Sequence, residues 1–196
     1  MRKHQNMNIT KKNIILSIIA AIAIGLSFLL DNIVINIINI IQYPLLFNFF
    51  YIITLLGEMY IFIFIAIILT AVLLTHKKPI TAFLLTLATT GIMTWLIKTI
   101  VNMPRPFQAL HIPSMITTNS SSFPSGHAMI FFALIPTMSK NFPKTRIIFW
   151  TIAILVGLSR IYLGVHYFSD VIAGAIFGYM IGMIFMKIGE TYEWKY

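Results

Sequence analysis

Six long apolar segments, separated by short polar stretches, constrain the fold of this chain more than any other feature. They cover residues 13–30, 50–74, 80–101, 125 to the residue before Lys140, 147–165 and 168–186. A helix that crosses a bilayer needs about 20 predominantly apolar residues. Only 10% of the residues are charged, against roughly 25% in ordinary soluble domains. The sequence therefore predicts an all-α, polytopic integral membrane protein of six transmembrane helices, with residues 1–196 in one domain.

Two of these segments leave alternatives open. The first is long for the apolar region of a signal peptide, which is roughly 7–15 residues, so we expect a retained helix. The fourth is the shortest, and it is short for a full crossing. Between the first and second segments, residues 31–42 alternate Asn with Ile and Val. Apolar residues recur there at helical spacing, which favours a short interfacial helix at the membrane surface over an irregular linker.

The basic residues predict the orientation. The net charge of +9 would suggest a nucleic-acid partner in a soluble protein, but here the cations lie between apolar segments. Four precede the first segment, two follow the second, three follow the fourth and two lie in the tail. Lys and Arg accumulate in cytoplasmic loops. We therefore expect a cell-membrane protein with both termini in the cytoplasm and no nucleic-acid partner. The opposite face has only Lys98, Arg105 and Arg160.

Three polar stretches meet on that outer face in the predicted topology. They are Lys98–Pro106, Pro124–His127 and Ser159–Asp170. Arginine and lysine bind phosphate oxygens, and the free N–H groups at a helix start, here Ser125 and Gly126, bind anions. Single cations could be interfacial anchors, but three of them beside two histidines favour an anion-binding site.

The histidines suggest catalysis. His166 and Asp170 are four residues apart and share a face if both are helical. A carboxylate on one ring nitrogen leaves the other free to attack. His127 follows the helix-start anion site and is placed to protonate a leaving oxygen. A zinc site of these three residues is the chemical alternative, but the neighbouring cations would repel a divalent ion. The chain has no cysteine, which excludes thiolate metal sites.

Together these residues resemble the tripartite signature of the type 2 phosphatidic acid phosphatase superfamily. The signature covers residues 98–170: Lys98 and Arg105-Pro106, then Pro124-Ser125-Gly126-His127, then Arg160, His166 and Asp170. The match is complete in residue type, spacing and order.

The resemblance implies a role for each residue. His166 would be the nucleophile that forms a phosphohistidine, Asp170 would orient it, and His127 would be the general acid. The phosphate oxygens would be bound by the remaining signature residues, Lys98, Arg105, Arg160, Ser125 and Gly126. The family needs no metal or other cofactor. The implied function is a lipid phosphatase with an outward-facing site, acting on undecaprenyl pyrophosphate, phosphatidylglycerol phosphate or phosphatidic acid in the bilayer.

Two other functions share these residues, namely lipid-to-lipid phosphotransfer and non-catalytic lipid binding or transport. The oligomeric state is left open. Glu58 lies outside the signature, within the second apolar segment. A carboxylate at that depth is costly unless it is paired. We expect it to face the site, where it would pair with a cation or shape lipid access, or else to form a structural hydrogen bond.

Overall fold

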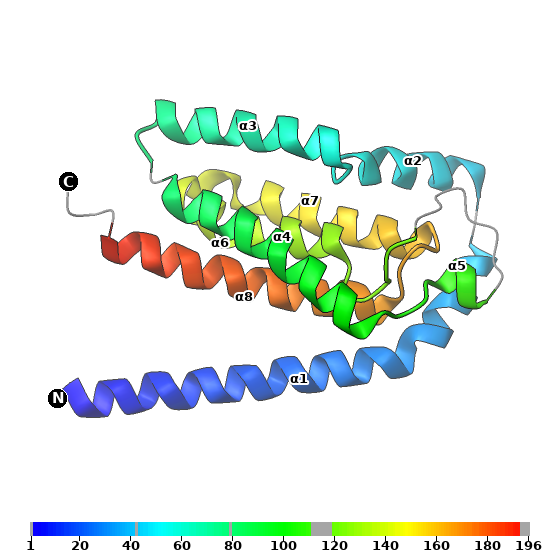
Figure 1. Ribbon diagram of the computed structural model, residues 1–196, viewed down its shortest axis with the longest axis horizontal. Helices are drawn as coiled ribbons and strands as arrows, with labels where there is room; N and C mark the ends of the chain where they lie inside the picture. Colours follow the sequence, from blue (N-terminus) through cyan, green and yellow to red (C-terminus); the bar gives the residue numbers. More distant parts are fainter. Residues whose placement is uncertain (1, 42, 79, 111–118, 193–196) are drawn as a thin grey trace.

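The structure is a computed structural model that describes residues 2–41, 43–78, 80–110 and 119–192. The elements in this part of the chain are helical: α1 (Arg2–Ile40), α2 (Pro44–Leu55), α3 (Met59–Thr75), α4 (Thr81–Val101), α5 (Pro106–Ala109), α6 (Gly126–Asn141), the 3-10 turn η1 (Pro143–Thr145), α7 (Arg146–Tyr162) and α8 (Phe168–Tyr192). Figure 1 shows the long helices side by side, with the start of α1 and the end of α8 at the same end of the bundle.

Several helices are long and apolar enough to cross a membrane. Four meet this condition singly within the described residues: 14–40, 81–109, 143–162 and 168–191. The bent pair of α2 and α3 makes a fifth if the two count as one span. The protein is therefore a multi-pass membrane protein. The fourth predicted crossing, and with it the total of six, is not confirmed, because α6 has only 16 residues.

The second predicted crossing is broken. The sequence analysis took residues 50–74 as one helix, whereas α2 ends at Leu55, α3 starts at Met59, and the two axes differ by 55°. Glu58 precedes α3 with an extended backbone (φ −67°, ψ 142°). The break is only three residues long, Leu56-Gly57-Glu58, and lies between two apolar runs, so hydropathy alone does not reveal it.

Residues 31–40 are helical, as the sequence predicts for 31–42, but the prediction of a separate helix there was wrong. Helix α1 runs without interruption to Ile40, and its last part bends away from the line of the rest (Figure 1). No Gly or Pro lies between Leu26 and Tyr43 to end the helix. Asp31, which suggested a boundary, is buried and accepts hydrogen bonds from the Ser169 N–H (2.8 Å) and Oγ (2.6 Å).

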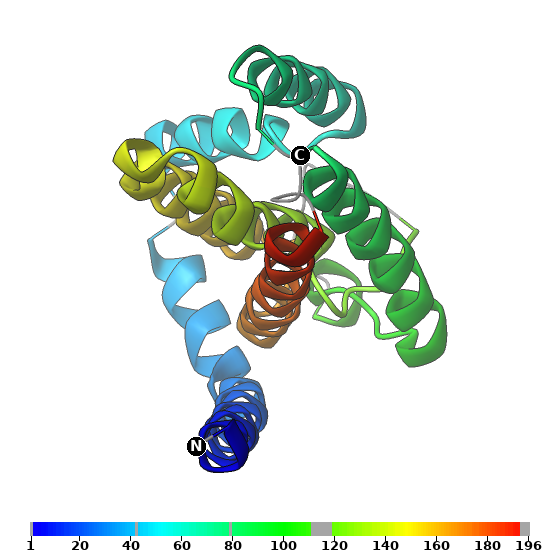
Figure 2. The ribbon, with the colours of Figure 1, turned by 90° about the vertical axis from the view of Figure 1, so that its left-hand side faces the viewer.

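Helices α6 and α8 form the centre of the bundle, and α1 lies on the side opposite α3 (Figure 2). Three glycines of α8, each four residues after the last, face the α6 backbone. A Cβ atom added to Gly174 would lie 2.6 Å from the Ser125 carbonyl oxygen. One added to Gly178 would lie 1.9 Å from the Met129 carbonyl oxygen, and one added to Gly182 would lie 2.1 Å from the Ala133 carbonyl oxygen. Small residues at this spacing let helix backbones approach closely in a membrane.

Candidate active site

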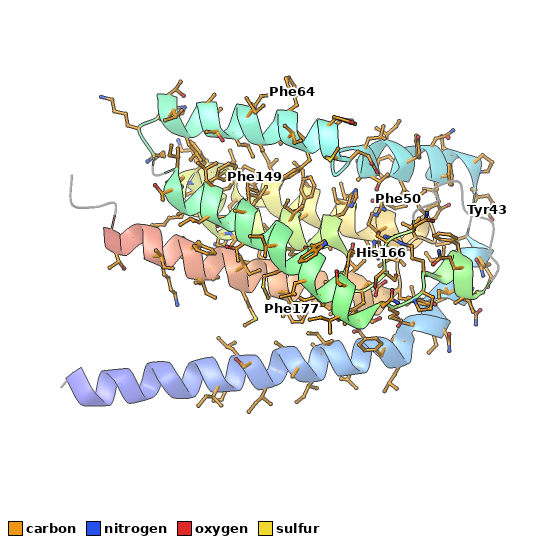
Figure 3. All side chains as sticks on the ribbon, in the orientation of Figure 1. Tyr43, Phe50, Phe64, Phe149, His166 and Phe177 are labelled. Carbon is orange, nitrogen blue, oxygen red and sulfur yellow. The ribbon has the colours of Figure 1, made fainter. Side chains whose placement is uncertain are left out.

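The three polar stretches lie at one end of the bundle. Lys98 is in the last turn of α4, Arg105 precedes α5, Ser125 precedes α6, Arg160 is in the last turn of α7, and Asp170 is in the first turn of α8. This is the end opposite the start of α1 (Figure 1). His166 lies inside the bundle near this end (Figure 3).

His166 and Asp170 contact each other directly. The His166 Nδ1 lies 3.2 Å from the Asp170 Oδ2, and both side chains are buried. His166 is not helical, contrary to the expectation that the pair shares a helix face, since α8 starts two residues later. The pair forms because the Asp170 Oδ2 also accepts the Tyr167 N–H at 2.8 Å, which folds the turn back onto the helix start.

Arg105 lies on the other side of the His166 ring. Its Nη1 is 3.2 Å from the His166 Nε2 and donates to the Val165 carbonyl at 2.9 Å. Its Nε and Nη2 donate to the backbone oxygen and Oγ of Ser120, both at 2.9 Å. A guanidinium only donates and a carboxylate only accepts. The neutral ring therefore carries its proton on Nδ1, toward Asp170, and has a lone pair on Nε2.

His166 favours its neutral form. Burial lowers its pKa well below the ordinary value, and the positive charges of Arg105, Arg160 and Lys98 lower the pKa further. At neutral pH the Nε2 lone pair is therefore available, which is the state that a nucleophilic or metal-binding imidazole requires.

Lys98 and Arg160 are held by different neighbours. The Lys98 Nζ donates to the carbonyl oxygens of Ser121 and, at 3.2 Å, Ser122. The Arg160 Nη1 donates to the Thr54 Oγ1 in α2, while its Nε is buried without a hydrogen-bond partner among the described residues. The site thus holds a buried donor that an anion can satisfy.

The start of α6 has the predicted form. Ser125 caps the helix, with its Oγ 3.5 Å from the Ala128 N–H, and its own N–H donates to the Asp170 backbone oxygen at 3.0 Å. This bond joins the start of α6 to the start of α8. A Cβ on Gly126 would lie 3.1 Å from Thr94. His127 lies beside the α2–α3 break, with its Nε2 3.8 Å from the Glu58 Oε1.

Ser122 is a member of the site that the sequence did not predict. Its Oγ donates to the Asp170 Oδ2 at 2.5 Å and lies 3.4 Å from the His166 Nδ1, and the side chain is fully buried. The sequence placed Ser122 in a polar cluster typical of an exposed loop, and no spacing rule singled it out. The sequence also did not single out Thr54, Gly57 or Asp31, because the residues that they contact are distant in the chain.

Comparison with known proteins identifies the family. The model of the PAP2 superfamily matches residues 79–194, which include every signature position. The chain belongs to the PAP2 superfamily. Phosphatidylglycerophosphatase B of Bacillus subtilis is 40% identical over 78 residues, which are 34% of this chain and 38% of that protein. Undecaprenyl-diphosphatase BcrC of the same organism is 31% identical over 134 residues, 64% of this chain and 67% of that protein.

A solved structure shares the fold of this PAP2 chain. The transmembrane phosphatidylglycerolphosphate phosphatase from B. subtilis superimposes with a TM-score of 0.75 at 23% identity, over 91% of this chain and 96% of that one. The sequence match to phosphatidylglycerophosphatase B covers less than half of that protein's length, whereas the structural match covers nearly all of the solved chain. The relatives are membrane phosphatases, so the PAP2 chain is assigned to a family of membrane lipid phosphatases.

Proposed function

We propose that this protein hydrolyses a phosphomonoester or pyrophosphate bond on a membrane lipid through a phosphohistidine intermediate. The observation that carries the proposal is the state of His166. Its Nδ1 is bound by Asp170, and its unprotonated Nε2 faces the Arg105 guanidinium. An oriented imidazole beside fixed cations is suited to attack a phosphorus atom whose oxygens those cations hold.

The other residues supply the rest of the reaction. Arg105, Arg160 and Lys98 would bind the phosphate oxygens together with the Ser125 hydroxyl and the Gly126 amide. In the first step the His166 Nε2 bonds to phosphorus, the P–O bond to the lipid breaks, and His127 protonates the leaving oxygen. In the second step water attacks phosphorus, passes its proton to His127, and releases phosphate from His166. The charge that develops on the phosphoryl oxygens is stabilised by cations already in place.

The substrates that this chemistry accepts are undecaprenyl pyrophosphate, phosphatidylglycerol phosphate and phosphatidic acid. The names of the two B. subtilis relatives support the first two. The charge distribution supports a site on the outer face of the cell membrane with both termini in the cytoplasm. Substrate would then reach the site by lateral diffusion between helices.

Phosphate release by the purified protein tests the proposal. The three lipids are assayed in detergent with excess chelator, using the wild type, His166→Ala and His76→Ala. His76 ends α3 and packs against Phe142 away from the signature residues, so it serves as a matched histidine control. We expect release that survives chelation, disappears in His166→Ala and persists in His76→Ala.

Each other outcome points to a different function. Loss of release on chelation would favour a metal site made of His127, His166 and Asp170. Phosphate transferred to an added lipid acceptor, in place of free phosphate, would indicate a phosphotransferase. No reaction with any lipid by the folded protein would favour lipid binding or transport.

A further inference from the structure

The break between α2 and α3 lies against the His127 ring. Glu58 ends the break, and its Oε1 is 3.8 Å from the His127 Nε2. The carboxylate is half-exposed, with 48% of its side-chain surface accessible, whereas the imidazole is 18% exposed. The distance is within ion-pair range but too long for a hydrogen bond.

Gly57 allows this approach. A Cβ atom on Gly57 would lie 2.0 Å from the His127 Cδ2 and 2.7 Å from its Nε2, both far inside van der Waals contact. The backbone of the break is therefore in contact with the ring, and a side chain at position 57 would push the two apart. The break is shaped around His127 and sets the position of the adjacent carboxylate.

Glu58 is also the acid that remains free for this role. Four of the five acidic residues lie in the described part of the chain. Asp170 binds His166 and Ser122, Asp31 binds Ser169, and Glu190 pairs with Lys140 at 2.8 Å. Glu58 is the one of these four in ion-pair contact with His127.

The other charges around His127 disfavour a protonated ring. Burial disfavours the charged ring most, and the positive charges of Arg160 in α7, Arg105 before α5 and Lys98 in α4 disfavour it further, whereas His166 before α8 is neutral. A general acid must nevertheless carry a proton when the leaving oxygen departs. A carboxylate about 4 Å away opposes the cations and favours the imidazolium.

We propose that Glu58 is a positioning residue that keeps His127 in its imidazolium form, so that the ring protonates the leaving oxygen of the lipid. The inference rests on the proposed function and deepens it. The Nε2 of His127 has no hydrogen-bond partner among the described residues, so its N–H is free to donate to substrate while Glu58 stabilises the charge. The proton moves from His127 to the oxygen as the P–O bond breaks, and the hydrolytic water restores it in the second step.

Leaving-group dependence separates this role from a structural one. Phosphatidic acid releases an alcohol, which needs a proton, whereas p-nitrophenyl phosphate releases a phenolate that departs unprotonated. The wild type, Glu58→Gln, Glu58→Asp and the matched control Glu190→Gln are assayed with both substrates. Thermal unfolding in detergent checks that each variant is folded.

We expect Glu58→Gln to lower kcat/KM for phosphatidic acid about tenfold, the effect of losing an opposite charge at this distance. The loss with p-nitrophenyl phosphate is expected to be several-fold smaller. The basic limb of the pH profile for phosphatidic acid moves to lower pH by about one unit. Glu58→Asp restores part of the activity, and Glu190→Gln matches the wild type.

Equal losses on both substrates, an unshifted basic limb, or wild-type activity in Glu58→Gln would overturn the inference. The proposed function would still hold in each of these cases, provided that the wild type is active and His166→Ala is inactive. An inactive wild type would overturn the proposed function, and this inference with it.

Discussion

The glycine interface between α6 and α8 allows a quantitative prediction. In Gly178→Ala the new Cβ would start 1.9 Å from the Met129 carbonyl oxygen. Real Cβ atoms essentially never come within 3.0 Å of such an atom, so the two backbones must separate by more than 1 Å. Replacing Gly by Ala in a helix interior gains about 1 kcal/mol from propensity. Overpacking costs roughly 1–3 kcal/mol, so we expect net destabilisation.

The same separation should reach the active site. Helix α6 begins next to Ser125, and the Ser125 N–H donates to the Asp170 backbone oxygen in α8. A shift of 1 Å in catalytic geometry can cost about 10²-fold in rate. We therefore expect kcat/KM of Gly178→Ala to fall by about 10-fold to 100-fold, because part of the shift is absorbed along the helix.

Gly91→Ala is the matched control, since a Cβ at Gly91 in α4 meets no atom within 4 Å. Thermal unfolding in detergent and phosphate release are measured on both variants. Gly91→Ala should keep its activity and be equally or slightly more stable. A Gly178→Ala protein as stable as Gly91→Ala would refute the close packing. Lower stability with unchanged kcat/KM would show that the interface does not hold the site geometry.

Three further predictions concern two buried titratable groups, His166 and Asp31. Because the pKa of His166 is lowered, its neutral form persists below about pH 6.5, the ordinary value; the acidic limb of kcat/KM for p-nitrophenyl phosphate should therefore lie below that pH, and a limb above it would contradict the assignment. As the pH falls, His166 in the unfolded chain binds a proton near about pH 6.5, before His166 in the folded protein does, because its pKa is lowered in the folded protein. The stability that the neutral His166 contributes is therefore present above about pH 6.5 and is lost as the pH falls through the folded-state pKa. Asp31→Asn weakens the two bonds from Ser169 and should destabilise the protein by about 1–3 kcal/mol in thermal unfolding, whereas the exposed Asn32→Ala should not; equal stability of the two variants would show that the Asp31 bonds contribute nothing.

The sequence predicted much of the candidate site because its chemistry depends on residue type and order. Lys98, Arg105, Arg160 and His166 were identified as charged or titratable groups in an otherwise apolar chain, where such groups are costly without a role. The predicted limits of the third apolar segment, 80–101, agree with α4 within one residue, and the start of the sixth agrees with α8. In each case a local signal, a polar stretch next to a long apolar run, determined the boundary.

The break at Gly57 and Glu58 was not predictable from local signals. Hydropathy is high on both sides, and the residue that the break contacts, His127, is distant in the sequence. Ser122 escaped for a similar reason. A serine in a polar loop has the same local pattern whether it faces solvent or, as here, donates to a buried carboxylate.

Residue type and the long apolar runs thus determined that this chain is helical, lies in a membrane and carries donors suited to a phosphate group, because those properties depend on local transfer free energies and on the donors that single side chains provide. The tertiary structure alone decided where the second apolar segment breaks and that Ser122 donates to Asp170. Helix α1 continues past Asp31, whose carboxylate is bound by Ser169, 138 residues away. Such pairings depend on three-dimensional packing, and a linear pattern does not specify them.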